Sequence, residues 1–131
     1  METNDLLAIY KSNRFTFDDD SWFSLDNLDY ANALGANFCV VTAFNPNNIQ
    51  LHRRKNKRRN IELECELVSN FVHYTYCEVG LEEHYEDSFC IFDISLEESL
   101  AIGAKYEQYS IFYFSNGIGG YYEVATKKLI V

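Results

Sequence analysis

The sequence predicts a single domain of the α+β class. Short apolar runs alternate along it with stretches that repeat every three to four residues, which are typical of strands and helices respectively. Its 131 residues, 47% of them hydrophobic, suffice to bury one core. A single Pro and six Gly leave little room for flexible linkers.

The N-terminal part predicts a helical extension. Apolar residues share one face of a helix over residues 5–11, and polar and aromatic residues alternate in a strand over 14–17. Residues 18–21 are typical of a turn. A second helix is predicted over 25–34, ended by Gly35.

The clearest strand is Phe38–Phe44, a nearly continuous apolar run, which indicates a central strand buried on both faces. Residues 45–48 end it, because Pro cannot continue a central ladder and Asn favours turns. The longest helix follows at 56–72. Its buried face is predicted from the recurring residues Ile61, Cys65, Val68 and Phe71, with Leu63 and Leu67 beside them.

The C-terminal half predicts a strand at 73–79, an acidic loop at 80–87 and an apolar strand at 89–94. Ser95 and Glu98 match a capping box, which indicates a helix over 96–107.

Further strands are predicted at 109–114, 121–125 and 129–131, with a turn at Asn116-Gly117, because Asn-Gly tolerates positive φ. From Phe38 onward the order is strand, helix, strand, strand, helix, strand. This is the ferredoxin-like split βαβ order, here with an N-terminal helical extension and a C-terminal hairpin.

Charge and cysteine content restrict the expected partners and cellular compartment. The net charge of −9 repels nucleic acid and anionic membranes on average and attracts basic partners. None of the four Cys residues forms a C-x-x-C pair, so reduced thiols in the cytoplasm are expected. Residues 1–10 lack the basic start of a signal peptide, and no apolar run reaches membrane-spanning length. We therefore expect no membrane association and no cofactor.

Four stretches resemble a known family. Phe38–Pro46 is similar to the motif "apolar strand, Thr-Ala-aromatic-Asn-Pro" of the bacterial domain-of-unknown-function family 3293. Asn56–Asn60 resembles its Asn-x-x-Arg-Asn helix start, and Glu86–Phe89 and Gln108–Phe112 resemble two later strand entries. The loop Leu81–Asp87 departs from the family by lacking Gly and Trp. The resemblance implies a small bacterial cytoplasmic protein and no particular activity.

A first candidate site consists of polar residues near the end of the central strand, namely Thr42, Asn45, Asn56, Arg59 and Gln108. One interpretation is a ligand pocket, in which Arg59 and the helix N-terminus hold an anion. The other is structural: these side chains cap the helix and satisfy backbone groups of the connecting loop.

A second candidate is a basic patch, composed of His52, Arg53, Arg54, Lys55, Lys57, Arg58 and Arg59. Cations at a helix start oppose the macrodipole and are unfavourable for local stability. Binding of a partner, an anionic ligand or nucleic acid is therefore a candidate reason for their presence. The alternative is a solvated segment in which Arg58 pairs with Glu62. The absence of aromatic residues between Asn45 and Phe71 argues against single-strand binding.

Metal and catalytic signals are weak. His73, Cys77, His84 and Cys90 have zinc-ligand types but match no known spacing. No nucleophile elbow, phosphate loop or dinucleotide fingerprint occurs, so neither a metal nor a catalytic set is predicted.

Three hypotheses follow. The first is a non-enzymatic binding module that uses the basic patch and the Asn45 strand end, with a protein partner, an anionic ligand or a homodimer as candidates. The second is an acidic immunity-type protein that neutralises a basic toxin through Asp18–Asp20 or the loop 82–87. The third is a small enzyme on a phosphorylated substrate with His52 as proton carrier, which requires His52 to face the Asn45 crevice.

Overall fold

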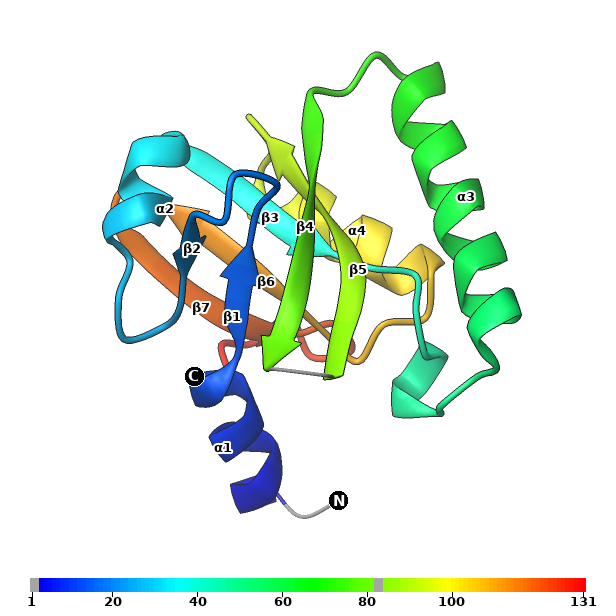
Figure 1. The fold of residues 1–131 in the computed structure, drawn as a ribbon, viewed down its shortest axis with the longest axis horizontal. Coiled ribbons are helices and arrows are strands. Elements are labelled where there is room, and N and C mark those ends of the chain that lie inside the picture. The colour runs from blue at the N-terminus through cyan, green and yellow to red at the C-terminus, as the bar shows by residue number, and fades with distance from the viewer. Residues whose placement is uncertain (1–2, 82–83) are drawn as a thin grey trace.

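A computed structural model describes residues 3–81 and 84–131 of the chain. They form a mixed α+β fold with four α-helices and one seven-stranded, curled antiparallel sheet (Figure 1). The elements in chain order are α1 (Thr3–Ser12), β1 (Arg14–Thr16), β2 (Trp22–Phe23), α2 (Asp29–Leu34), β3 (Asn37–Val41), a 3₁₀ turn (Pro46–Asn48), α3 (Arg53–Ser69), β4 (Tyr74–Leu81), β5 (His84–Phe92), α4 (Leu96–Lys105), β6 (Ser110–Ser115) and β7 (Ile118–Glu123). None of the helices described is long and apolar enough to cross a bilayer.

The sheet has the order β2-β1-β4-β5-β3-β6-β7 and curls so that side chains from its two ends pack together. Phe15 of β1 packs its ring 4.7 Å from Phe112 of β6 and 6.0 Å from Tyr121 of β7, although three strands separate β1 from β6 in the sheet. Figure 1 shows β1 and β2 lying across β6 and β7. The curl therefore gathers side chains from both ends of the sheet into one core on the inner face, which Tyr10 of α1 and Ala31 of α2 also join.

The strand β3 is buried on both sides, as predicted. Phe38 and Val40 point to the inner face and join a core rich in aromatic rings. Cys39 and Val41 point to the opposite face, which α3 and α4 cover with Leu63, Leu67 and Leu100. The continuous apolar run is explained by this double burial, although the strand ends at Val41 instead of Phe44.

Two local predictions in the C-terminal half are confirmed. Ser95 caps α4, because its Oγ accepts from the Glu98 N–H at 3.0 Å. In return, the Glu98 carboxylate accepts from the Ser95 N–H. Asn116 and Gly117 adopt φ of 51° and 83° in the turn that joins β6 to β7. The C-terminal hairpin expected from strands at 121–125 and 129–131 is not formed as predicted, because β7 pairs with β6 instead. The stretch 129–131 makes only an isolated bridge, from Leu129 to Tyr122.

Other predictions were wrong in extent. The predicted acidic loop at 80–87 is mostly strand, since β4 runs to Leu81, β5 begins at His84, and Gly80 pairs with Tyr85. Residues 82–83 of that loop lie outside the described part. The predicted helix over 25–34 is reduced to α2, and the two-residue strand β2 was missed. The N-terminal extension thus also contributes β1 and β2 to the sheet.

The predicted buried face of the long helix was also wrong. The residues of α3 that are buried are Asn56, Asn60, Leu63 and Leu67. Ile61 and Val68 are 60% and 58% exposed, Phe71 is 96% exposed, and Cys65 is exposed as well. The 3.6-residue period allowed both faces. In the folded protein, the buried face is the one that carries Asn56 and Asn60, whose side chains bond to the backbone that follows β3.

Candidate functional site

The chain leaves regular structure directly after β3, in the segment 42–51. Asn45, Asn47 and Asn48 there have φ of 47°, 54° and 61°. Left-handed backbone is uncommon for residues other than Gly, although Asn tolerates it best, and it persists only where the surroundings hold it. Three such residues within four positions therefore require supporting contacts.

Asn60 and Thr42 supply the first of these contacts. The buried Asn60 amide accepts from the Ala43 N–H at 2.8 Å and donates to the Asp87 carbonyl at 2.8 Å. Thr42 Oγ1 donates to the same carbonyl at 2.7 Å and accepts from the Phe44 N–H at 3.1 Å. These two side chains replace the ladder bonds that the backbone no longer makes.

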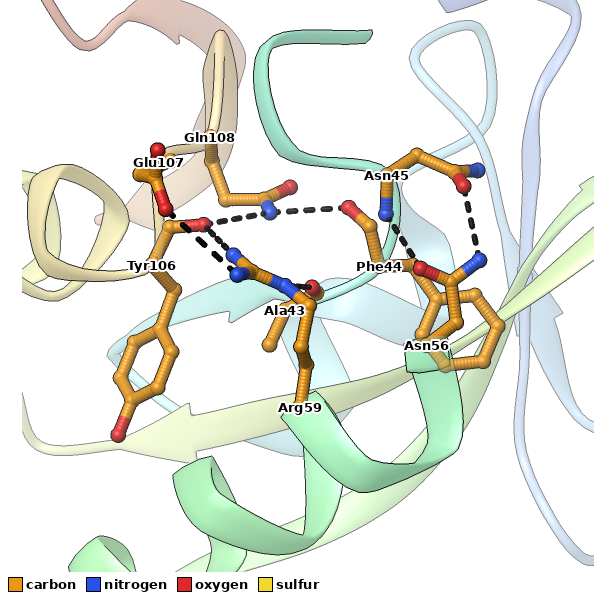
Figure 2. Close-up of polar contacts among 8 residues, drawn as sticks. All are labelled: Ala43, Phe44, Asn45, Asn56, Arg59, Tyr106, Glu107 and Gln108. Carbon is orange, nitrogen blue, oxygen red and sulfur yellow. Dashed lines mark hydrogen bonds and ion pairs between the residues drawn. The ribbon is translucent and has the colours of Figure 1, made fainter. Parts of the chain in front are cut away.

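Asn45 and Asn56 form a reciprocal pair (Figure 2). Asn56 Oδ1 accepts from the Asn45 N–H and Asn56 Nδ2 donates to Asn45 Oδ1, both at 2.8 Å. Asn45 Oδ1 also accepts from the Leu51 N–H at 3.0 Å, and Asn45 Nδ2 donates to Glu86 Oε1 at 2.9 Å. The side chain of Asn45 is therefore fully engaged within the protein.

Arg59 and Gln108 hold the other side of the same segment (Figure 2). Arg59 donates from Nε to the Ala43 carbonyl and from Nη2 to the Tyr106 carbonyl, each at 2.6 Å, and its Nη1 lies 3.6 Å from Glu107 Oε1. Gln108 Nε2 donates to the Phe44 carbonyl at 3.0 Å. The guanidinium thus binds the chain's own carbonyl oxygens.

The five residues of the first candidate site do converge, but on the backbone of the segment 42–51. Their contacts correspond to the structural interpretation, and a ligand role for them stays a prediction. Thr42, Asn45 and Gln108 also line a cavity of about 800 Å³ on the inner face, which Asn56 and Arg59 do not reach.

Two participants, Asn60 and Glu86, were not among the five residues predicted for the first candidate site. Asn60 carried a signal, because it follows Asn56 by one helical turn and two Asn on one helix face are unusual. Nothing in the local sequence distinguishes Glu86 from its acidic neighbours.

The basic patch lies on the first turns of α3 and faces solvent. Arg53, Arg54, Lys55, Lys57 and Arg58 are exposed, and none forms an ion pair with a described residue. The predicted pair of Arg58 with Glu62 is therefore not formed. Arg59, the last member, turns inward as described above.

His52 belongs to the patch as the N-cap of α3, where its Nδ1 accepts from the Arg54 N–H at 3.1 Å. Its side chain is exposed and lines neither of the two principal cavities of the described residues. The enzyme hypothesis thus lacks the geometry that it required of His52.

An apolar row continues the basic patch along α3. Arg54, Arg58, Ile61, Cys65 and Val68 are spaced four and three residues apart in alternation, which places them on one side of the helix. All five are exposed. We call this row the outer stripe of α3; its spacing is the one on which a partner helix packs in coiled coils.

The thiols and imidazoles form no metal site among the described residues, where no group of three or more His, Cys, Asp or Glu is arranged to hold an ion. Cys39, Cys77 and Cys90 are buried, and all four Cys are free. Burial raises the pKa of Cys39 to about 12, which makes its thiol unreactive.

Comparison with known proteins yields one match. The model of the family described as "Protein of unknown function (DUF3293)" matches residues 41–111, more than half of the chain. No curated protein and no solved structure matches the chain significantly. The matched region begins at the end of β3 and contains Thr42, Asn45, Asn56, Arg59, Asn60, Glu86 and Gln108. The polar residues that hold the segment 42–51 thus fall within the region that defines the family, and the chain belongs to DUF3293.

Proposed function

We propose that this protein is a non-enzymatic binding module that docks an acidic protein partner on the outer stripe of α3. The observation that carries the proposal is that cations without an ion pair to any described residue adjoin exposed apolar side chains on one helix face. Arg54 and Arg58 lead directly into Ile61, Cys65 and Val68, and all are exposed.

Neither half of this surface stabilises the isolated protein. Exposed Arg and Lys in the first turns of α3 oppose the helix macrodipole, each at a cost of about 0.3–1 kcal/mol. Clustered apolar side chains in water gain nothing until they are covered. A partner that brings carboxylates to the cations and an apolar face to Ile61 and Val68 would offset both the macrodipole repulsion and the exposure of apolar side chains.

The charge distribution favours a distinct acidic protein over other partners. Nucleic acid is disfavoured, because its phosphates would contact only Arg54 and Arg58 and would leave the exposed Ile61, Cys65 and Val68 uncovered. A second copy that paired its α3 antiparallel, centred near Leu63, would place Arg54 and Arg58 opposite Val68 and its C-terminal neighbours. Residues 68–72 carry no carboxylate there, so the cations would remain unmatched.

In this proposal the Asn45 strand end has a positioning role. Asn45 and Asn56 tie the segment 42–51 to the first turn of α3, and Arg59 anchors the second turn to the Ala43 carbonyl. The start of α3 is therefore held rigidly, which lowers the entropy lost when a partner binds.

We also infer that β3, α3, β4, β5, α4 and β6 constitute a ferredoxin-like split βαβ unit. The neighbour order β4-β5-β3-β6 and the packing of both helices on one face support this inference. The free state of all four Cys supports a reducing cytoplasm as the compartment.

The decisive experiment captures partners on the immobilised chain, purifies the protein recovered and measures its Kd by calorimetry. Arg54→Glu combined with Arg58→Glu removes the cations, and Ile61→Ser combined with Val68→Ser removes the apolar contact. We expect each pair to raise the Kd at least about tenfold, because central interface residues carry most of the binding energy. The wild-type affinity should fall with added salt.

Matched controls place the same changes elsewhere. Lys127→Glu with Lys128→Glu reverses two exposed charges, and Ile118→Ser removes a side chain that is 77% exposed on β7. Both should leave the Kd unchanged. The proposal fails if the stripe variants bind as tightly as the wild type, if nuclease abolishes capture, or if the only ligand recovered is a second copy of this chain.

A further inference from the structure

The cavity of about 800 Å³ on the inner face lies where three neighbouring strands change character together. Thr42 follows β3, Glu86 and Ser88 lie in β5, and Ser110 begins β6. All four line the cavity, whereas farther along the same face these strands carry Phe38, Cys90 and Phe114, and the face is filled with rings. The inner face is thus a packed core at one end and a polar-floored cavity at the other.

Aromatic side chains from α1 and β7 form one wall of this cavity. Tyr10 of α1 and Tyr121 of β7 stack with ring centroids 4.1 Å apart. The Tyr10 hydroxyl is hydrogen-bonded to Ser110 Oγ at 2.6 Å, and Asn13 Nδ2 donates to the Tyr121 hydroxyl at 3.4 Å. These bonds fix the rings in place, so the wall exists before any ligand arrives.

One carboxylate reaches into this cavity. Asn45 Nδ2 holds Glu86 Oε1 at 2.9 Å, and Oε2 accepts no hydrogen bond from a described residue. The described lining contains no Lys or Arg, and His84 is the only imidazole. Burial raises the pKa of the Glu86 carboxyl, a shift that the Asn45 bond partly opposes. A cation beside Oε2 would favour the ionised form.

The size and lining match those of small-molecule sites, which enclose roughly 300–1,000 Å³ with mostly apolar walls and a few convergent polar groups. Strained backbone is also concentrated here, because Asn45, Asn47 and Asn48 with their positive φ all border the cavity. Two independent features, the cavity and the fixed carboxylate, therefore coincide.

We propose that this cavity binds a small organic ammonium compound, with the ammonium group on Glu86 and an apolar or aromatic body against Tyr10 and Tyr121. The carboxylate supplies a charge-assisted hydrogen bond and the ring faces attract the cation. An anionic ligand is disfavoured, because no described Lys or Arg lines the cavity.

The test titrates 2-phenylethylammonium into the isotope-labelled full chain and follows amide shifts by NMR. We expect saturable millimolar binding, as is usual for a fragment of this size, with the largest shifts at Glu86, Ser110 and Tyr121. Glu86→Gln keeps the oxygen that accepts from Asn45 and removes the charge. It should weaken the probe at least about tenfold, and the neutral analogue 2-phenylethanol should bind equally weakly to both forms.

Asp87→Asn is the matched control. Asp87 adjoins Glu86 in β5 but lies outside the described lining of this cavity, and its contribution to Thr42 and Asn60 comes from its backbone carbonyl alone. This variant should retain the wild-type Kd. Equal weakening by both variants would indicate nonspecific attraction to an acidic protein and overturn the proposal, as would an absence of shifts at about 10 mM probe. The outer stripe of α3 plays no part in this experiment, so the two proposals fail separately.

Discussion

The strand β3 and the segment 42–51 that follows it are held in opposite ways. The backbone of β3 pairs with β5 on one side and β6 on the other, and its side chains are free to fill two apolar cores. The backbone of the following segment has no sheet neighbours. Side chains of Asn45, Asn56, Arg59, Asn60 and Gln108 satisfy it instead.

This difference shows the structural role of the polar residues in the region matched by the family. A backbone that leaves a sheet inside a protein exposes donors and acceptors that cannot be left unpaired. Here side-chain amides and one guanidinium replace the lost ladder. The residues that resemble a ligand site by type are largely occupied by that task, and the exposed cations at the start of α3 lie beside them.

The largest effect should come from the core around β3. Phe38 is fully buried and its ring lies 4.9 Å from Phe114 and 5.8 Å from Phe23. Phe38→Ala should lower the free energy of unfolding by about 3–5 kcal/mol, because it leaves a cavity among rings. Chemical denaturation measures this. Phe71→Ala, at a 96% exposed position, should change stability by less than about 0.5 kcal/mol; similar losses for both would contradict the assigned core.

An intermediate effect is expected where side chains replace the ladder. Asn60→Ala leaves the Ala43 N–H without its acceptor in a buried setting and should cost about 1–3 kcal/mol in the free energy of unfolding. Asn70→Ala is its control, since Asn70 also donates to a backbone carbonyl, that of Glu66, but is exposed. Thermal and denaturant unfolding of both variants should separate them. Equal stabilities would mean that the segment 42–51 does not depend on Asn60.

The smallest effect should follow loss of a peripheral contact to the same segment. Gln108→Ala removes the donor to the Phe44 carbonyl but leaves room for water, so the free energy of unfolding should fall by only about 0.5–1.5 kcal/mol. Amide hydrogen exchange should show faster opening confined to residues near Phe44. Uniformly faster exchange throughout β3 would show that the strand and the segment unfold as one unit, and the contrast between them would then be lost.

Some features could be predicted from sequence because their local sequence pattern indicates them. The capping box at Ser95 and the positive φ at Asn116-Gly117 depend on neighbours within a few residues, and both are confirmed. The double burial of β3 is also confirmed, because its continuous apolar run indicates it locally although distant elements cover the strand. Features that depend on distant partners were missed. The strand β2 has only two residues, and it exists because Phe23 stacks on Phe15 and packs near the rings of Phe38 in β3 and Phe112 in β6.

The candidate site divides in the same way. Sequence identified Thr42, Asn45, Asn56, Arg59 and Gln108 as a polar set, and they do converge on one stretch of backbone. It assigned the wrong face of α3, because Ile61, Cys65 and Val68 satisfy helical periodicity as well as Leu63 and Leu67 do. Only packing distinguishes an apolar row that covers the sheet from one that faces water.

By itself, then, the sequence determined the α+β class, the position of the central strand and the family resemblance, because these follow from local pattern and composition. The tertiary structure decided which side of α3 is exposed, that Arg59 binds backbone carbonyls, and that Glu86 enters a cavity floored by three strands. Those outcomes depend on the curl of the sheet and on contacts between residues dozens of positions apart, for which local periodicity carries no signal.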